Sequence, residues 1–323
     1  MSSISFNFTD LEDIPPALWS LRCGIGKRDC TITEKHLAPL DDLAVRLGVT
    51  QHARQNAKRL ATGYRDLVVL LLEPSDKAEE VSYHEMLECS TALKYVNDSL
   101  RLAFDGRRDL DNTVVLDIRP YRSDRIRMQQ KEEDRIADDE PAYEATEEIL
   151  TLLRPDLVLI CQCQTSDVGN RFAADYCSSV ESSGDLSLSG LRNGHKIVKI
   201  NSFHPMYFAR TDKDKEPLKR MIRKYLFDTT FLVAANFLAG RRLSGFGMDN
   251  LRQCAEHGPV TKFTSEGVRI TCQWTDEDDV ASPSLIQRLE ELGLGAKHHR
   301  STELDQLLSR NLQKHKKYDD FVS

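Results

Sequence analysis

The chain has 323 residues, of which 40% are hydrophobic and 29% charged, and its formal net charge at pH 7 is −7. This composition is ordinary for a globular protein with a full core, and the negative charge argues against a wholly basic nucleic-acid coat protein. No apolar run approaches about 18 residues, and the first residues have neither a basic start nor an apolar core. We therefore expect an intracellular protein with no signal peptide and no membrane partner.

The eight cysteines form no Cys-x-x-Cys pair. Cys161 and Cys163 are separated by a single residue, which is a poor start for a tetrahedral zinc site. We expect reduced, buried thiols, and neither a metal nor another cofactor.

Residues 1–63 are predicted to form a helical N-terminal extension. One helical segment opens at Thr33 and continues to Leu47, and Thr50 is placed to cap a second segment that ends near Gly63.

Residues 64–245 alternate four short apolar runs with helical patterns. Continuous runs of Val, Ile and Leu are typical of a parallel sheet that is buried on both faces. The runs are Leu67–Leu72, Thr113–Leu116, Leu157–Ile160 and Lys196–Ile200. The expected helices are Ser82–Phe104, Pro141–Leu153, a short one through Phe172 and Tyr176, and Pro217–Leu238; Ser178–Gly190 is expected to be a loop or hairpin.

Residues 246–323 read as an addition packed on this core, with a hairpin over Val260–Trp274 and helices over Ser282–Leu292 and Lys297–Lys317. The predicted fold is α/β, a three-layer sandwich around a short, mainly parallel four-stranded sheet with the helical extension and the C-terminal hairpin and helices.

Polar side chains follow each apolar run. They are Glu73, Asp117, Gln162 with Gln164, and His204. In open α/β sheets the ligand site lies at the carboxyl ends of the strands, so these residues are the candidates for chemistry.

Two basic clusters follow the second and fourth runs. The first runs from Arg119 to Lys131 and the second from Lys213 to Lys224. Local positive charge can bind phosphate on a protein that is acidic overall; solvated helix faces are the alternative interpretation.

Three short motifs stand at these strand ends: Leu-Leu-Glu-Pro-Ser at 71–75, Val-Leu-Asp at 115–117, and Ser-Phe-His-Pro-Met-Tyr-Phe at 202–208. In order and spacing, residues 64–240 resemble the uracil-DNA glycosylase superfamily. There the first strand ends in Gly, an acidic or polar residue and Pro, the second in a base-reading residue, and the fourth in His-Pro. Leu71 replaces that Gly, and Ser75 replaces the aromatic residue of the uracil-specific branch, so a strict uracil filter is not expected.

The resemblance implies that Glu73 and His204 are catalytic. Hydrolysis of an N-glycosidic bond needs a carboxylate near the sugar and a hydrogen-bond donor at the departing base, and a neutral His204 can supply that donor. The alternatives are that Glu73 is an N-cap for the turn before Val81, and that His204 is a buried imidazole whose hydrogen bonds are satisfied.

The resemblance places base binding at Asp117, with Tyr83 or His84 as a stacking platform. An ionised Asp117 accepts hydrogen bonds but donates none, so it would accept from an exocyclic amine. The alternative role for Asp117 is a salt bridge to Arg119 or Arg122. The alternative role for Tyr83 is packing in the hydrophobic core.

Base flipping is helped by an apolar wedge, and Phe208 stands at the family's wedge position. The alternative is that Phe208 packs the start of the next helix. The expected phosphate contacts are Arg210, Lys213, Lys215, Arg119 and Arg122.

The function so implied is that of a DNA glycosylase-like hydrolase that cleaves the N-glycosidic bond of a flipped, damaged or deaminated base, with DNA as partner and the nucleus as location. A second hypothesis is a superfamily member without turnover that binds nucleic acid or protein. A third is a chance resemblance, with a nucleoside or phosphate compound as substrate.

Overall fold

The computed structural model describes 2–5, 14–23, 34–162, 178, 180–191, 193–210, 216–244, 251–252, 255–256, 260–264 and 267–271. The chain divides into two compact units. The sheet unit comprises 26–101 and 106–209, and the terminal unit comprises 1–25, 102–105 and 210–323. These units cut across the three segments expected from the sequence.

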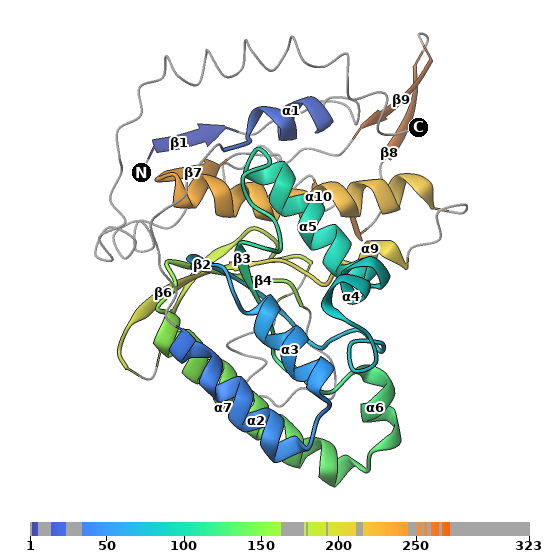
Figure 1. Cartoon of the computed structure of the whole chain (residues 1–323). Helices are drawn as coiled ribbons and strands as arrows, with labels where there is room; N and C mark the ends of the chain where they lie inside the picture. Colours follow the sequence, from blue (N-terminus) through green and yellow to red (C-terminus); the bar gives the residue numbers. More distant parts are fainter. Residues whose placement is uncertain are drawn as a thin grey trace. The chain divides into compact units, whose positions relative to one another are not determined.

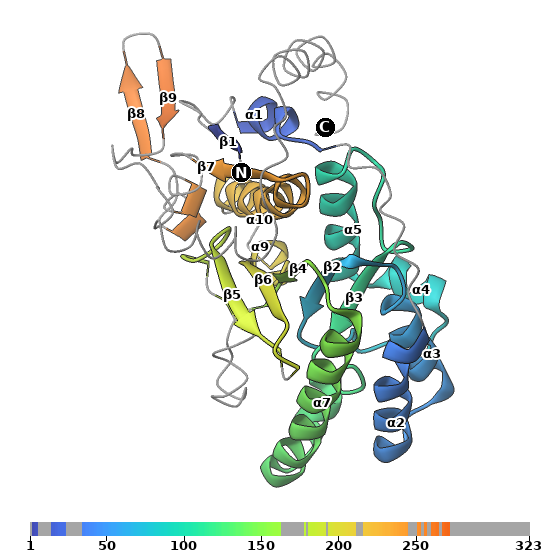
Figure 2. The ribbon, with the colours of Figure 1, turned by 90° about the vertical axis from the view of Figure 1, so that its left-hand side faces the viewer.

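The sheet unit is built on five strands in the order β3-β2-β4-β6-β5 (Figures 1 and 2; β5 is labelled in Figure 2). Their bounds are β2 Tyr64–Leu71, β3 Thr113–Asp117, β4 Leu157–Ile160, β5 Leu186–Gly190 and β6 Lys196–Asn201. All neighbours are parallel except β5, which pairs antiparallel with β6.

The predicted α/β class is confirmed, but the prediction of four strands is one short. The fifth strand, β5, lies in the stretch expected to be a loop or hairpin and forms a hairpin with β6. Its residues Leu-Ser-Leu-Ser-Gly alternate and stay half-buried or exposed. An edge strand of this kind lacks the continuous apolar run that identifies the buried strands.

The helices of the sheet unit are short except for one. They are η2 Glu34–Leu37, α2 Ala38–Leu47, α3 Gln51–Leu60, α4 Tyr83–Cys89, α5 Thr91–Ala103, α6 Asp124–Gln129, α7 Glu132–Leu153 and α9 Met206–Ala209. The last residues of α5 belong to the terminal unit. The predicted cap is confirmed, because the Thr50 hydroxyl accepts from the Ala53 N–H of α3 at 3.2 Å.

Two predicted helices have different bounds. The expected helix Ser82–Phe104 is interrupted at Ser90, whose backbone is extended and whose hydroxyl accepts from the Leu93 N–H at the start of α5. The helix expected to start at Pro141 starts at Glu132 and carries Pro141 inside it. A proline can therefore mark the interior of a helix as well as its first turn.

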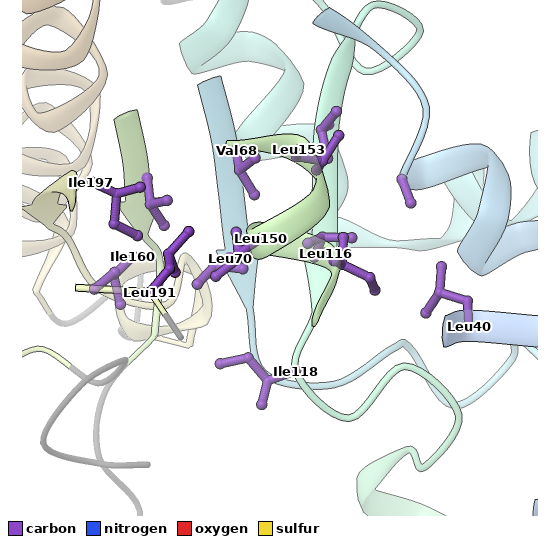
Figure 3. Packing of buried hydrophobic residues seen from close by; sticks show 14 of the residues in the cluster. Leu40, Val68, Leu70, Leu116, Ile118, Leu150, Leu153, Ile160, Leu191 and Ile197 are labelled. Carbon is purple, nitrogen blue, oxygen red and sulfur yellow. The ribbon is translucent and has the colours of Figure 1, made fainter. Parts of the chain in front are cut away.

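Helices lie on both sides of the sheet, an arrangement compatible with a three-layer sandwich. On one side Leu150 and Leu153 of α7 join a buried cluster with Val68 and Leu70 of β2 and with side chains of β3, β4 and β6 (Figure 3). On the opposite side of β2 and β3 lies α5 (Figures 1 and 2). The four strands β2, β3, β4 and β6 are thus buried on both faces, as their continuous apolar runs predict.

The terminal unit contains α1 Ile14–Ser20, α10 Pro217–Leu238 and two small sheets. β1 Ser2–Ser5 pairs in parallel with β7 Arg241–Ser244, and β8 Val260–Thr264 forms an antiparallel hairpin with β9 Gly267–Thr271. The predicted long helix and the hairpin are confirmed. The helices expected near 172–176, 282–292 and 297–317 lie outside the described residues.

Among the described residues, no helix is both long and apolar enough to cross a membrane.

Candidate functional site

The carboxyl edge of the sheet carries the candidate site. Because β2, β3, β4 and β6 are parallel, their carboxyl ends lie at the same edge of the sheet. Asp117 is the last residue of β3, and Glu73, Gln162 and His204 follow the ends of β2, β4 and β6. The ladder continues past the strands, since the Ile118 N–H donates to Leu71 O at 2.9 Å and the Ser202 N–H to Ile160 O at 2.9 Å.

Glu73 and His204 do not follow adjacent strands of the sheet. β4 lies between β2 and β6, so the two strand ends are about 10 Å apart, at roughly 4.8 Å for each strand spacing. The strand ends that flank Glu73 are that of β3, where Asp117 pairs with Leu71, and that of β4, where Ile160 pairs with Leu70.

Glu73 and Asp117 form a pair of carboxyl groups with unequal surroundings. Glu73 is half-buried, and its Oε2 lies 3.7 Å from Arg119 Nη1. The Oδ1 atom of Asp117 is buried and has no hydrogen-bond partner within the described residues. Burial, followed by the charge of Glu73, raises the pKa of Asp117 to about 7.

Arg119 belongs to a buried ionic cluster and not to the surface. Its guanidinium is 1% exposed and donates to Asp139 of α7 at 2.9 Å and to the Tyr143 hydroxyl at 3.4 Å. Arg127 donates to the same carboxylate at 2.5 Å. The expected phosphate contact of Arg119 is therefore incompatible with this conformation, because the guanidinium is enclosed among carboxylates.

The alternative for Asp117, a salt bridge to Arg119 or Arg122, is also not formed. The Arg122 Nε donates to Asp138 Oδ2 at 2.7 Å, and Arg122 is half-buried. Both arginines are engaged by carboxylates of α7, which leaves Asp117 with no cation of its own among the described residues.

His204 is held by the backbone of the turn that follows β6. The Met206 N–H donates to His204 Nδ1 at 3.3 Å. Since Nδ1 accepts, the proton of the neutral ring is on Nε2. The side chain is half-buried, so an Nε2–H donor at this strand end is compatible with the role expected for it.

The two stacking candidates differ in exposure. Tyr83 is buried, with the Arg59 guanidinium 4.2 Å from its ring centre, and its hydroxyl has no hydrogen-bond partner within the described residues. Burial raises the pKa of Tyr83 to about 12. This placement agrees with core packing. His84 is exposed, edge-on to Tyr83.

Phe208 is 1% exposed and packs edge-on against Tyr95 of α5, with ring centres 4.5 Å apart. This placement agrees with the packing alternative and differs from that of an exposed wedge. Arg210 is exposed, whereas Lys213 and Lys215 lie outside the described residues.

The sequence reading missed Asp139 and Tyr143, which together hold Arg119 beside Glu73. Their spacing of four residues places both side chains on the same face of α7, but the predicted helix begins at Pro141 and so does not include Asp139. Ser75 was also missed as a polar group at this edge: its buried Oγ has no hydrogen-bond partner in the described part of the chain.

No group of three or more His, Cys, Asp or Glu side chains suited to a metal ion occurs among the described residues. Comparison with protein-family models gives no match, and neither does comparison with curated proteins.

Proposed function

We propose that the chain is a DNA glycosylase-like hydrolase that cleaves the N-glycosidic bond of a flipped, damaged or deaminated base. The observation that carries the proposal is that Glu73, Asp117 and His204 all lie at the carboxyl ends of parallel strands, at one edge of the sheet. The motifs at these strand ends are those in which the sequence resembles the uracil-DNA glycosylase superfamily.

In the proposed reaction the nucleotide lies over the carboxyl ends of β2, β4 and β6, so that Glu73 and His204 approach it from strands on either side of β4. Glu73 orients a water molecule and offsets the positive charge that develops on the sugar. The water oxygen bonds to the anomeric carbon as the bond to the base breaks, and the proton of the water passes to Glu73. The Nε2–H of His204 stabilises the negative charge on the departing base.

The ion pair with Arg119 supports the role of Glu73. A guanidinium at 3.7 Å favours the ionised carboxylate, which is the form that the reaction requires. Asp139 and Tyr143 bind the guanidinium of Arg119, which lies beside Glu73, and are therefore positioning residues.

The contact with DNA is proposed to include Arg210, Lys213 and Lys215, with the nucleus as the location. Phe208 and Arg119 contribute only if the chain rearranges on binding, since both are buried.

The test is a glycosylase assay with oligonucleotides that carry uracil, hypoxanthine, xanthine or a mismatch. We expect an alkali-labile abasic site with at least one of them, and a rate lowered at least about 100-fold in Glu73→Gln. Glu88→Gln, an exposed carboxylate on α4, serves as the matched control and should retain the full rate. An undiminished rate in Glu73→Gln, or no product from any oligonucleotide, would refute the proposal.

The second candidate is a binding module without turnover. The burial of Phe208 and Arg119 favours it, because an enzyme that flips bases is expected to expose its wedge and its phosphate contacts. Such a protein would retain DNA in a salt-dependent way without forming an abasic product. If neither activity is found, nucleoside hydrolysis is the next assay.

A further inference from the structure

Glu73 and Asp117 are neighbouring carboxyl groups at this edge of the sheet, and only Glu73 lies beside a positively charged side chain within the described residues. Glu73 faces Arg119, whose guanidinium is also bound by Asp139 and Tyr143. Asp117 stands on the adjacent strand, in register with Leu71. Its Oδ1 is buried and lacks a hydrogen-bond partner within the described residues.

This arrangement disfavours a second negative charge. Among the described residues, Glu73 is the one charged group that shifts the protonation of Asp117, and it does so with the same sign. Two carboxylates at one site do not both ionise readily, and the guanidinium stabilises the charge on Glu73. The proton of the pair therefore belongs on Asp117, in keeping with a pKa of about 7 for this group.

A protonated carboxyl group offers different hydrogen bonds from an ionised one. The neutral acid has an O–H donor beside a carbonyl acceptor, whereas the carboxylate only accepts. An ionised Asp117 would match a base edge with two donors, such as the ring N–H and amine of guanine. A neutral Asp117 matches an edge with one donor beside one acceptor.

We propose that Asp117 binds the flipped base as a neutral carboxylic acid, donating one hydrogen bond to the base edge and accepting another from it. This inference rests on the proposed function and narrows its substrate class to bases with a mixed donor–acceptor edge. Uracil and hypoxanthine present such an edge as a ring N–H beside a carbonyl. Recognition is lost as the pH rises and Asp117 ionises, because the donor disappears.

The proposal explains why Asp117 Oδ1 is buried without a hydrogen-bond partner among the described residues. A buried polar atom that lacks a hydrogen bond is costly, and a base edge would supply the missing bond. Ser75 Oγ, two residues beyond Glu73, is a second buried atom of the same kind at the end of β2.

The test compares the wild type, Asp117→Asn and the control Asp111→Asn, an exposed carboxylate before β3. Cleavage of uracil and hypoxanthine oligonucleotides is measured between about pH 5 and pH 9. Above the pKa of Asp117, kcat/KM of the wild type should fall about tenfold for each pH unit. Asp117→Asn should show no such fall, because an amide keeps both a donor and an acceptor at every pH. Asp111→Asn should follow the wild type.

A second measurement does not depend on turnover. The carboxyl signal of Asp117, identified by infrared difference between the wild type and Asp117→Asn, should show a protonated group at pH 6. Binding of the same oligonucleotides, measured by fluorescence anisotropy, should weaken above pH 7 in the wild type alone.

The outcomes separate the two proposals. If no product forms but binding depends on pH as expected, the proposed hydrolase activity is refuted and the proposal that Asp117 binds the base as a neutral acid is supported. Product formation with Asp117 ionised at pH 6, or with identical pH profiles in the wild type and Asp117→Asn, would refute the neutral acid alone. No binding at any pH would refute both.

Discussion

Glu73 and Asp117 both carry a carboxyl group at the ends of neighbouring strands, yet their surroundings favour opposite protonation states. The Arg119 guanidinium favours a charged Glu73, whereas burial beside Glu73 favours a neutral Asp117. Pairs of titratable groups with divergent protonation are a common feature of active sites, although structural ion pairs also produce them. The protonation of Asp117 therefore predicts that the free energy of unfolding depends on pH, as ligand binding does.

The stability of the wild type should fall with pH through the titration of Asp117. Its pKa is 3.8 unfolded and about 7 folded, so between these values the folded state binds one more proton than the unfolded state. The free energy of unfolding then decreases as the pH rises from about 4 to 7, by up to about 4 kcal/mol, at roughly 1.4 kcal/mol per pKa unit. Above pH 7 this contribution is constant.

Asp117→Asn removes this titration. Urea unfolding at pH 5 and pH 8 should show the variant gaining stability relative to the wild type at the higher pH. Asp111→Asn should keep the wild-type dependence. An equal difference between Asp117→Asn and the wild type at both pH values would contradict the assigned pKa.

The register between β2 and β3 depends on a close approach just before β2. The Tyr64 N–H donates to Asn112 O at 2.9 Å. A Cβ atom on Gly63 would lie 2.6 Å from the backbone of Thr113. Only glycine allows the two backbones to come this close. The same two strands lead to the candidate site, because Glu73 comes two residues after the end of β2 and Asp117 is the last residue of β3.

Gly63→Ala should therefore destabilise the protein by about 1–3 kcal/mol, since backbone atoms must move to accept the methyl group. Chemical unfolding is the measurement. Gly190→Ala on β5 is the matched control, because a Cβ atom there meets nothing within 4 Å. Comparable losses in the two variants would show that the close approach is not what restricts position 63.

The two compact units are each stabilised by contacts between residues far apart in the sequence. In the terminal unit, the side chain of Asn236 on α10 donates to Leu21 O at 2.8 Å. In the sheet unit, Arg119 after β3 is bound by Asp139 of α7. The candidate residues Glu73, Asp117 and His204 all belong to the sheet unit.

Asn236→Ala should weaken the terminal unit selectively. Leaving the buried Leu21 carbonyl without this donor costs about 1–3 kcal/mol. Hydrogen exchange should accelerate in α1 and α10, while the amides of β2 and β4 keep their protection because they lie in the other unit. Equal acceleration in both sets of amides would indicate that the chain opens as one cooperative body.

Local sequence signals predicted the elements well where they are strong. The four apolar runs correspond to β2, β3, β4 and β6, and Thr50 and Pro217 mark helix starts. The signals failed where an element is half-exposed, as in β5, or where one residue interrupts a continuous pattern, as at Ser90. Exposure of Phe208 and Arg119 could not be predicted, because Tyr95 and Asp139 bury them from distant parts of the chain.

The order of amino acids was sufficient to establish which polar residue follows which strand, since apolar periodicity and turn chemistry act over a few residues. The sheet order required the folded chain, because strand pairing joins segments that are far apart in the sequence. That order places Asp117 next to Glu73 and puts β4 between Glu73 and His204. The protonation of Asp117 follows from the same packing, because burial and a neighbouring charge exist only once the strands are assembled.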